Sequence, residues 1–165
     1  MGAADFNLRS RDVINSNLGT LWIVLPNGRL RKMGEVRNIQ ARIDVASEEF
    51  RCIGEMMHRH KGVGMRGSGS MNIYTGTPEF LHYLNDFKND FINYRFTIHC
   101  ENRDPETIDG EGRGVQIIEI TDVLLHGSEL FKLDTEDGLL DQDVDFDFDD
   151  YQILQEYNFP LTSAE

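Results

Sequence analysis

The chain has 165 residues, of which 39% are hydrophobic and 27% are charged, a composition typical of one folded domain. The formal net charge of −13 disfavours tight binding to the phosphates of nucleic acids. The 2 cysteines form no CxxC pair, which disfavours a disulfide framework and indicates a reducing compartment. No apolar run approaches the roughly 20 residues that span a bilayer, so no membrane segment is expected.

The charge is distributed unevenly along the chain. Residues 1–80 contain 11 Lys/Arg and 8 Asp/Glu, whereas residues 81–165 contain 5 Lys/Arg and 21 Asp/Glu. One interpretation is that the solvated loops of the second half are acidic. The other is that a positive face of one copy meets a negative face of another, an arrangement that sets register and partner choice in self-assembly.

The N-terminal part is predicted to form an arm followed by a hairpin. Residues 1–18 are polar and are expected to be loose when the protein is alone, ahead of a single domain over residues 19–165. Two β-rich runs, at 20–25 and 29–33, are separated by a turn that contains Asn27-Gly28. Because both turn residues accept a positive φ, this pair is a strong hairpin signal.

The next segment is predicted to be a strand and then a glycine-rich loop. Polar and apolar residues alternate over 35–45, with one phase slip near Asn38 that indicates a β-bulge. Residues 46–70 are locally basic and rich in glycine toward their end, which favours a mobile or extended loop and not a helix. A further strand is expected over 70–75.

One helix is predicted, over residues 77–90. Thr77 is a candidate N-cap, and Pro78 suits the first helical position. An apolar stripe along this helix is expected to pack on a sheet or at the end of a barrel. The stripe consists of Phe80, Leu81, Leu84, Phe87 and Phe91.

The C-terminal half is predicted to be β-rich, with a strand that has one apolar and one anionic face. Its other expected elements are strands over 94–100 and 115–125, a polar loop over 101–114, a break at His126-Gly127 and a turn over 134–138. In the strictly alternating run at 143–149, Val144, Phe146 and Phe148 are expected to face a core. Asp145, Asp147 and Asp149 line the other face, where water, salt or a basic partner must separate the like charges.

The sequence contains no GxSxG, HExxH or Walker motif, so no catalytic residue, cofactor or metal ligand is predicted. Residues 62–67 match GxGxxG, but no hydrophobic strand precedes them and no helix is expected to follow. His58 and His60 lack a third zinc ligand nearby, and the run at 143–150 lacks the glycine and closing glutamate of an EF-hand. Clustered carboxylates leave a small hydrolase as the catalytic alternative to a structural protein.

The order of these features resembles the tail tube proteins of contractile phage tails and tailocins, in the branch found in phage-like elements of Gram-positive bacteria. The resemblance covers roughly residues 20–160. It rests on the stretch HKGVGMRGSGSM at 60–71, the helix that opens with Pro78, the strand Arg95-Phe96-Thr97-Ile98, and the closing Asp/Phe strand.

The resemblance implies a mainly β protein, a β-barrel or β-sandwich with one flanking helix and extended loops. Such proteins form hexameric rings that stack into a hollow tube within a contractile sheath. Partners would include the sheath protein and the baseplate or initiator and terminator proteins, and DNA would pass through the lumen without specific binding. The protein would reside in a virion tail or tailocin particle assembled in the cytoplasm of the bacterial host.

The resemblance also implies where copies would touch. The N-terminal arm and the loop at about 47–69 would contact neighbouring subunits, and the anionic face of Asp145, Asp147 and Asp149 would line the lumen or an interface. Segments 35–45 and 66–75 are candidates for a lumen-lining hairpin. The alternative is a monomeric ligand-binding β-barrel or sandwich with an apolar pocket. Candidate contact residues are Arg9, Arg11, Arg51, His58, Arg59, Lys61 and Arg66.

Overall fold

The computed structural model describes residues 18–74, 79–104, 114–133 and 138–157, and the described residues form seven strands and one helix. The mainly β class with one flanking helix is therefore confirmed. Residues 1–17, Thr77, Pro78 and most of the expected turn at 134–138 lie outside the described residues. The elements are β1 (Gly19–Val24), β2 (Leu30–Lys32), β3 (Val36–Phe50), β4 (Arg59–Tyr74), α1 (Glu79–Asp90), β5 (Arg95–Arg103), β6 (Val115–Ser128) and β7 (Asp141–Gln155).

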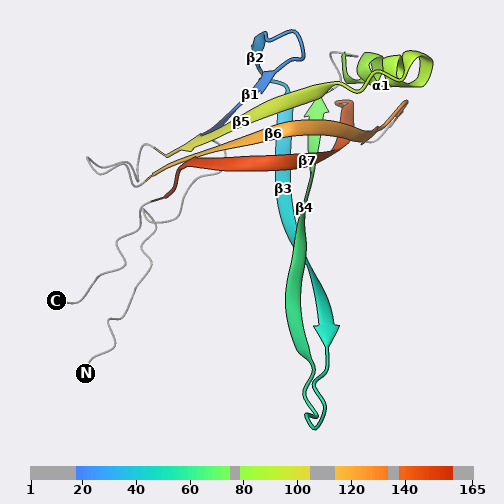
Figure 1. Cartoon of the computed structure of the whole chain (residues 1–165). Helices are drawn as coiled ribbons and strands as arrows, with labels where there is room; N and C mark the ends of the chain where they lie inside the picture. The colour runs from blue at the N-terminus through green and yellow to red at the C-terminus, as the bar shows by residue number, and fades with distance from the viewer. Residues whose placement is uncertain (1–17, 75–78, 105–113, 134–137, 158–165) are drawn as a thin grey trace, which may run out of the picture.

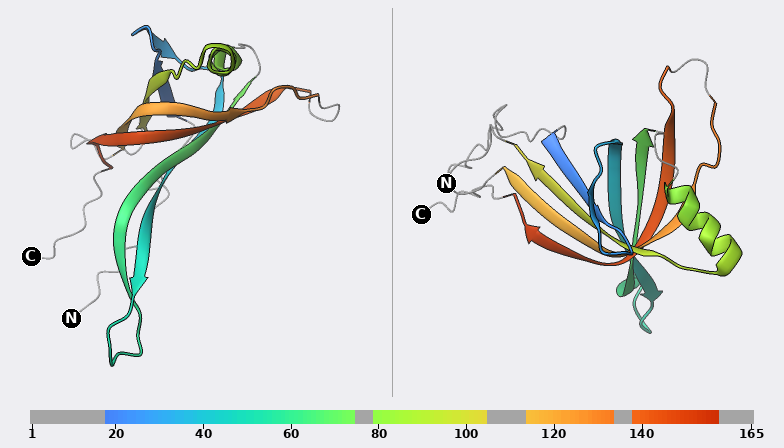
Figure 2. Two further views of the ribbon diagram at one scale, coloured as in Figure 1. Left: turned by 45° about the vertical axis from the view of Figure 1, so that its right-hand side comes forward. Right: turned by 90° about the horizontal axis from the view of Figure 1, so that it is seen from above.

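All seven strands belong to one antiparallel sheet in the order β2-β1-β5-β6-β7-β4-β3. The sheet is open, with β2 at one edge and β3 at the other. Figure 1 shows that β1, β5, β6 and β7 form a curved layer with α1 at one end, and that the β3–β4 hairpin leaves this layer and projects away from it. The two views of Figure 2 show the same projection, so the part of the hairpin that lies beyond the β4–β7 pairing forms an arm of the molecule.

The predicted β1–β2 hairpin is present, but only one of its two turn residues has a positive φ. Gly28 has φ +79°, and its N–H donates to the Leu25 carbonyl at 2.8 Å. Asn27 contributes through its side chain, whose Oδ1 accepts a hydrogen bond from the Arg29 N–H at 2.9 Å. Gly28 therefore supplies the left-handed residue that the turn requires.

The prediction of a loop over 46–70 is wrong for most of its length. β3 runs to Phe50 and β4 begins at Arg59, so only residues 51–58 connect them. The expected bulge is present, because the β3–β4 register shifts between Val36 and Asn38, and a second shift follows between Ala46 and Ser47. The glycines in β4 gave the segment a composition typical of a loop. Two of them lie within the strand, at positions where neighbouring side chains pack against the backbone.

Gly67 and Gly69 make room for two phenylalanine rings of the neighbouring strand. In the β4–β7 register Gly67 lies opposite Phe148 and Gly69 opposite Phe146. A Cβ at position 69 would lie 2.5 Å from the Phe146 ring, and a Cβ at position 67 would overlap the Phe148 ring. Gly67, the last glycine of the GxGxxG match, and Gly69 just beyond it therefore serve ring packing at the junction of β4 and β7.

The core lies on one face of the sheet, and the expected inward residues of β7 are in it. Val144, Phe146 and Phe148 are buried, which confirms the alternation of this strand. Burial of this apolar face is the main source of stability for the fold. The other buried members of the cluster are Leu21, Ile23, Met33, Met71, Ile73, Phe80, Phe96, Ile98, Ile120 and Val123.

Helix α1 covers the core with its first half only. Phe80 is buried against Phe96 with ring centroids 6.4 Å apart, and Tyr83, which was outside the predicted stripe, contacts the same ring at 5.1 Å. Phe87 and Phe91, which were predicted to pack, are exposed. The helix lies at the end of the sheet, so its last turns extend beyond the surface that they would otherwise cover (Figure 1).

Strand β6 continues past the predicted break at His126-Gly127. The strand ends at Ser128, and its register with β7 shifts between Leu125 and Gly127. A β-bulge thus accommodates the glycine without ending the strand, because the neighbouring strand keeps pairing on both sides of it.

The start of β7 is joined by polar contacts to three other segments. Asp141 accepts hydrogen bonds from Lys132 at 2.7 Å and Asn72 at 2.9 Å, and Arg37 lies 3.4 Å away. The hydrogen bonds from Lys132 and then Asn72 lower the pKa of the Asp141 carboxyl to about 2. The ionised carboxylate therefore holds β3, β4 and the segment before β7 together.

Replacing Gly69 with alanine is expected to lower the free energy of unfolding by about 1–3 kcal/mol, because the new methyl group displaces the Phe146 ring. Gly64→Ala is the matched control, since nothing lies within 4 Å of a Cβ at that position of the same strand. Denaturant unfolding followed by the fluorescence of the single tryptophan measures both. Equal stability of the two variants would contradict the packing role of Gly69.

The Asp141 contacts predict a specific acid sensitivity. Because the folded-state pKa of about 2 lies below the ordinary pKa of an aspartate, the contribution of Asp141 to stability is present above about pH 4 and is lost as the pH falls toward 2. The Asp141→Asn variant is expected to be less stable at neutral pH and to lose less stability over that acid range. Asp145→Asn serves as the control, and the same acid profile in wild type and Asp141→Asn would contradict the assignment.

Candidate assembly surfaces

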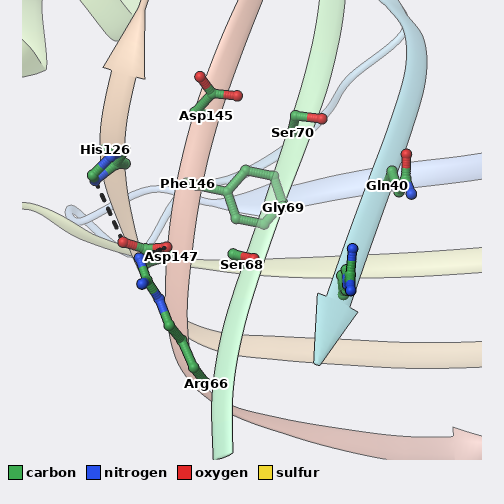
Figure 3. Close-up of a pocket in the computed structure, with 10 residues that line it drawn as sticks. Gln40, Arg66, Ser68, Gly69, Ser70, His126, Asp145, Phe146 and Asp147 are labelled. Atoms are coloured by element: carbon green, nitrogen blue, oxygen red, sulfur yellow. Dashed lines mark ion pairs between the residues drawn. The ribbon is translucent and has the colours of Figure 1, made fainter. Parts of the chain in front are cut away.

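The carboxylates predicted on the outer face of β7 lie on one polar surface that crosses three strands. Asp145 pairs in register with Ser70 of β4, and Asp147 pairs with Ser68. On β3, Gln40 lies opposite Ser70. Figure 3 shows Asp145, Asp147, Ser68 and Ser70 together on this face. The period of two along each strand therefore places this polar face opposite the apolar core.

Basic residues of the same chain accompany two of the three predicted carboxylates. Asp147 lies 3.6 Å from Arg66 and 3.4 Å from His126, and Figure 3 marks the His126 pair. Asp149 lies 3.1 Å from Arg95. Asp145 has no ion pair within the described ranges. The face is thus acidic but partly neutralised, and the expected repulsion between its neighbouring carboxylates is reduced.

A shallow hollow of about 370 Å³ lies on this face. Polar side chains make up most of its lining, and its two sides come from β3 and β7, with β4 between them (Figure 3). Such a surface suits contact with water and ions better than an apolar ligand. Its residues are Gln40, Arg42, Arg66, Ser68, Gly69, Ser70, His126, Asp145, Phe146 and Asp147.

The predicted basic contact residues separate into two places. Arg51, His58, Arg59 and Lys61 cluster where β3 and β4 end, far from the core, whereas Arg66 lies beside Asp147 on the polar face. Arg9 and Arg11 lie outside the described residues. At the end of the hairpin, Glu55 accepts a hydrogen bond from Arg59 at 2.7 Å, and Glu49 pairs with His58.

An apolar tip at the end of the hairpin was missed by the sequence reasoning. Ile53, Met56 and Met57 are exposed, with Met56 at 94% of its maximal accessible area. The sequence did contain a signal for this tip. Three large apolar residues lie in a segment whose glycines and charges indicate a position outside the core. Large side chains grouped in this way mark a contact surface.

A second exposed apolar surface surrounds the start of β7 and was also missed. Leu81 of α1 lines a groove of about 130 Å³ with Leu130, Phe131, Leu133 and Leu140. The segment that carries them is held by the Lys132–Asp141 pair and by a hydrogen bond of 2.8 Å from Gln142 to the Glu129 carbonyl. These apolar side chains therefore stay exposed on an anchored segment.

Two long strand edges have no partner within the part of the chain described. β3 pairs only with β4 along its length, so its other edge is free. β7 pairs with β4 only up to Phe148, which leaves residues 149–155 with β6 on one side and a free edge on the other. Unpaired backbone N–H and C=O groups in extended strands are templates for pairing with another chain.

The described residues offer neither a metal cluster nor a transmembrane helix. No group of three or more His, Cys, Asp or Glu among them is placed to hold a metal ion. None of the described helices is both long and apolar enough to cross a membrane.

Solved structures with the same fold include chains of a prophage baseplate and of a contractile injection system. The anti-feeding prophage baseplate contains a chain that matches with a TM-score of 0.60 and 10% identity, covering 82% of this chain and 91% of that chain. A chain of the sheath–tube complex of an extracellular contractile injection system, PVC, matches with a TM-score of 0.55 and 10% identity, covering 91% and 93%. At this identity the likeness shows the shared fold.

Sequence comparison identifies the family. The phage-like element PBSX protein XkdM of Bacillus subtilis (strain 168) is 23% identical over 146 residues, which cover 88% of this chain and 93% of XkdM. The family model described as "Phage tail tube protein" matches residues 6–155. The chain therefore belongs to the phage tail tube protein family.

Proposed function

We propose that this chain is the protomer of the inner tube of a contractile phage tail or phage-tail-like bacteriocin. In this role it assembles into stacked hexameric rings that enclose a hollow conduit for DNA or form a membrane-puncturing tube. The role is structural and not catalytic, and it rests on interfaces between copies. Residues 19–165 would act as a single tail-tube domain, with residues 1–18 as an arm that reaches a neighbour.

The observation that carries the proposal is the pair of free strand edges on β3 and β7. A free edge 15 residues long, as on β3, is a hazard for an isolated protein because it invites uncontrolled pairing. Ring closure removes the hazard, since an edge of each copy pairs with an edge of the next and none is left over. Six-fold closure is supported by the anti-feeding prophage baseplate, which was solved with 6-fold symmetry.

The polar face of β3, β4 and β7 is the surface that we assign to the lumen. It is opposite the core, and it presents Asp145, Asp147 and Asp149 with serine and glutamine side chains between the strands. An anionic surface repels the phosphates of DNA, so DNA would slide along it without specific binding. Arg66 beside Asp147 reduces the repulsion between carboxylates that ring formation would otherwise increase.

The remaining predicted partners follow from the same assembly. A sheath protein would surround the tube, and baseplate or initiator and terminator proteins would bind its ends, which the PVC sheath–tube complex and the anti-feeding prophage baseplate support by analogy. Arg51, His58, Arg59 and Lys61 remain candidates for contacts between subunits. The particle would be assembled in the cytoplasm of the bacterial host.

Negative-stain electron microscopy of the concentrated protein is expected to show rings or tubes. Val45→Lys, which places a charge on β3, is expected to abolish them while the monomer stays folded, because a lysine on an edge strand blocks strand pairing. Leu30→Lys is the matched control, since Leu30 and Val45 are both 62% exposed but Leu30 lies on the short strand β2.

Two results would contradict the proposal at different levels. A wild-type protein that stays monomeric at every concentration, even with sheath and baseplate proteins present, would exclude a tube protomer and favour a monomeric ligand-binding module. Normal rings from Val45→Lys would leave the tube in place but exclude pairing through the edge of β3.

A further inference from the structure

A histidine stands at the edge of the polar face that carries the carboxylates of β7. The β6–β7 register shifts between Leu125 and Gly127, so His126 is the extra residue of the β-bulge in β6. Its Nδ1 atom lies 3.4 Å from a carboxylate oxygen of Asp147 (Figure 3). The His126 side chain is 67% exposed, so protons from the solvent reach it directly.

The hollow beside His126 contains as many carboxylates as arginines, yet one carboxylate keeps no cation. Arg66 lies 3.6 Å from Asp147, whereas the Nε atom of Arg42 donates to Asp44, outside the hollow, at 2.8 Å. Across the described ranges no cationic side chain pairs with Asp145. The charged groups that line the hollow together with His126 are Asp145 and Asp147 of β7, Arg66 of β4 and Arg42 of β3.

On its other side His126 adjoins α1 and the segment before β5, which present two phenols to it. A groove of about 170 Å³ is lined by His126, by Tyr83 of α1 and by Tyr94, with apolar side chains between them. Burial raises the pKa of the Tyr83 phenol, and a hydrogen bond of 3.1 Å to Asp86 raises the pKa of the Tyr94 phenol. Both phenols therefore stay uncharged at neutral pH, whereas histidine is the side chain whose charge changes between pH 5 and 8.

An unpaired carboxylate costs little in a free subunit, because water surrounds it. In the proposed hexameric ring six polar faces converge on one lumen, so the negative potential there is larger than at the surface of a single copy. A negative potential favours the protonated form of an imidazole. A protonated His126 would supply the cation that each hollow lacks, because Arg66 and His126 would then stand against Asp145 and Asp147.

We infer that His126 is a proton-binding site coupled to assembly, so that convergence of the polar faces favours proton binding and a lower pH in turn favours the tube. The two effects are reciprocal, because the assembled state binds more protons than the free subunit. Assembly is therefore strengthened as the pH falls through the range in which histidine titrates, and the gain ends once the free subunit is protonated as well. The inference rests on the proposed function, because it needs the polar faces to meet around a lumen.

The pH dependence of tube formation by the full-length chain tests the coupling. The critical concentration for assembly, measured by sedimentation of the tubes, is expected to fall roughly threefold to tenfold between pH 8 and pH 5.5, where tenfold corresponds to one pKa unit between the two states. His126→Asn keeps a polar side chain that binds no proton in this range, and it is expected to remove most of the dependence. His82→Asn is the matched control, since His82 is exposed on α1, and it is expected to behave as the wild type.

A second variant keeps the test decisive if His126→Asn does not assemble. Asp145→Asn removes the unpaired carboxylate, so it is expected to assemble at pH 8 nearly as well as the wild type does at pH 5.5 and to depend less on pH. The full wild-type pH dependence in Asp145→Asn, or in His126→Asn where it assembles, would overturn the coupling through His126 and leave the proposed tube function intact, as would wild-type tubes that form equally well at both pH values. A wild-type protein that forms neither rings nor tubes at any pH would overturn both.

Discussion

The packing of two phenylalanine rings of β7 onto glycines of β4 is the constraint on which the rest of the structure depends. Phe146 and Phe148 occupy the space that side chains at positions 69 and 67 would fill, so β7 and β4 approach closely over a buried, apolar junction. That junction is the only sheet connection between the body of the protein and the β3–β4 hairpin within the described residues. It therefore determines where the hairpin leaves the sheet and in which direction its unpaired edges and its tip are presented.

The same alternation that buries these rings creates the polar face. Because successive side chains of a strand point to opposite sides, burying Phe146 and Phe148 places Asp145, Asp147 and Asp149 on the outer side, while the facing positions of β4 are small and polar. The cost of grouping carboxylates is reduced by Arg66 of β4 and Arg95 of β5. One sequence period thus produces the apolar core on one face and the polar surface on the other, and a one-residue slip of β7 would abolish both.

The sequence predicted the alternation of β7, the β1–β2 hairpin, the helix and the mainly β class, because each depends on local periodicity or on one turn residue. It did not predict the arm-like hairpin. Two glycines of β4 are required by phenylalanine rings about 80 residues later in the chain, and the local sequence does not distinguish them from loop glycines. It also misassigned Phe91, which caps α1 with φ +54° and is 81% exposed. Glycine is the usual residue where a helix ends in a left-handed conformation, and a bulky residue is rare there. Helical spacing alone therefore cannot show that Phe91 adopts this conformation.

A chain with free edges on β3 and β7 and two apolar surfaces at opposite ends is incomplete as a monomer. In the proposed tube, edge pairing would act in the plane of a ring, because it would extend the sheet sideways from one copy to the next. The hairpin tip and the start of β7, which carry the two apolar surfaces, lie at opposite ends of the molecule (Figure 1). The chain therefore offers two chemically different kinds of surface to a partner: strand edges that can form backbone hydrogen bonds, and apolar side chains that can be buried.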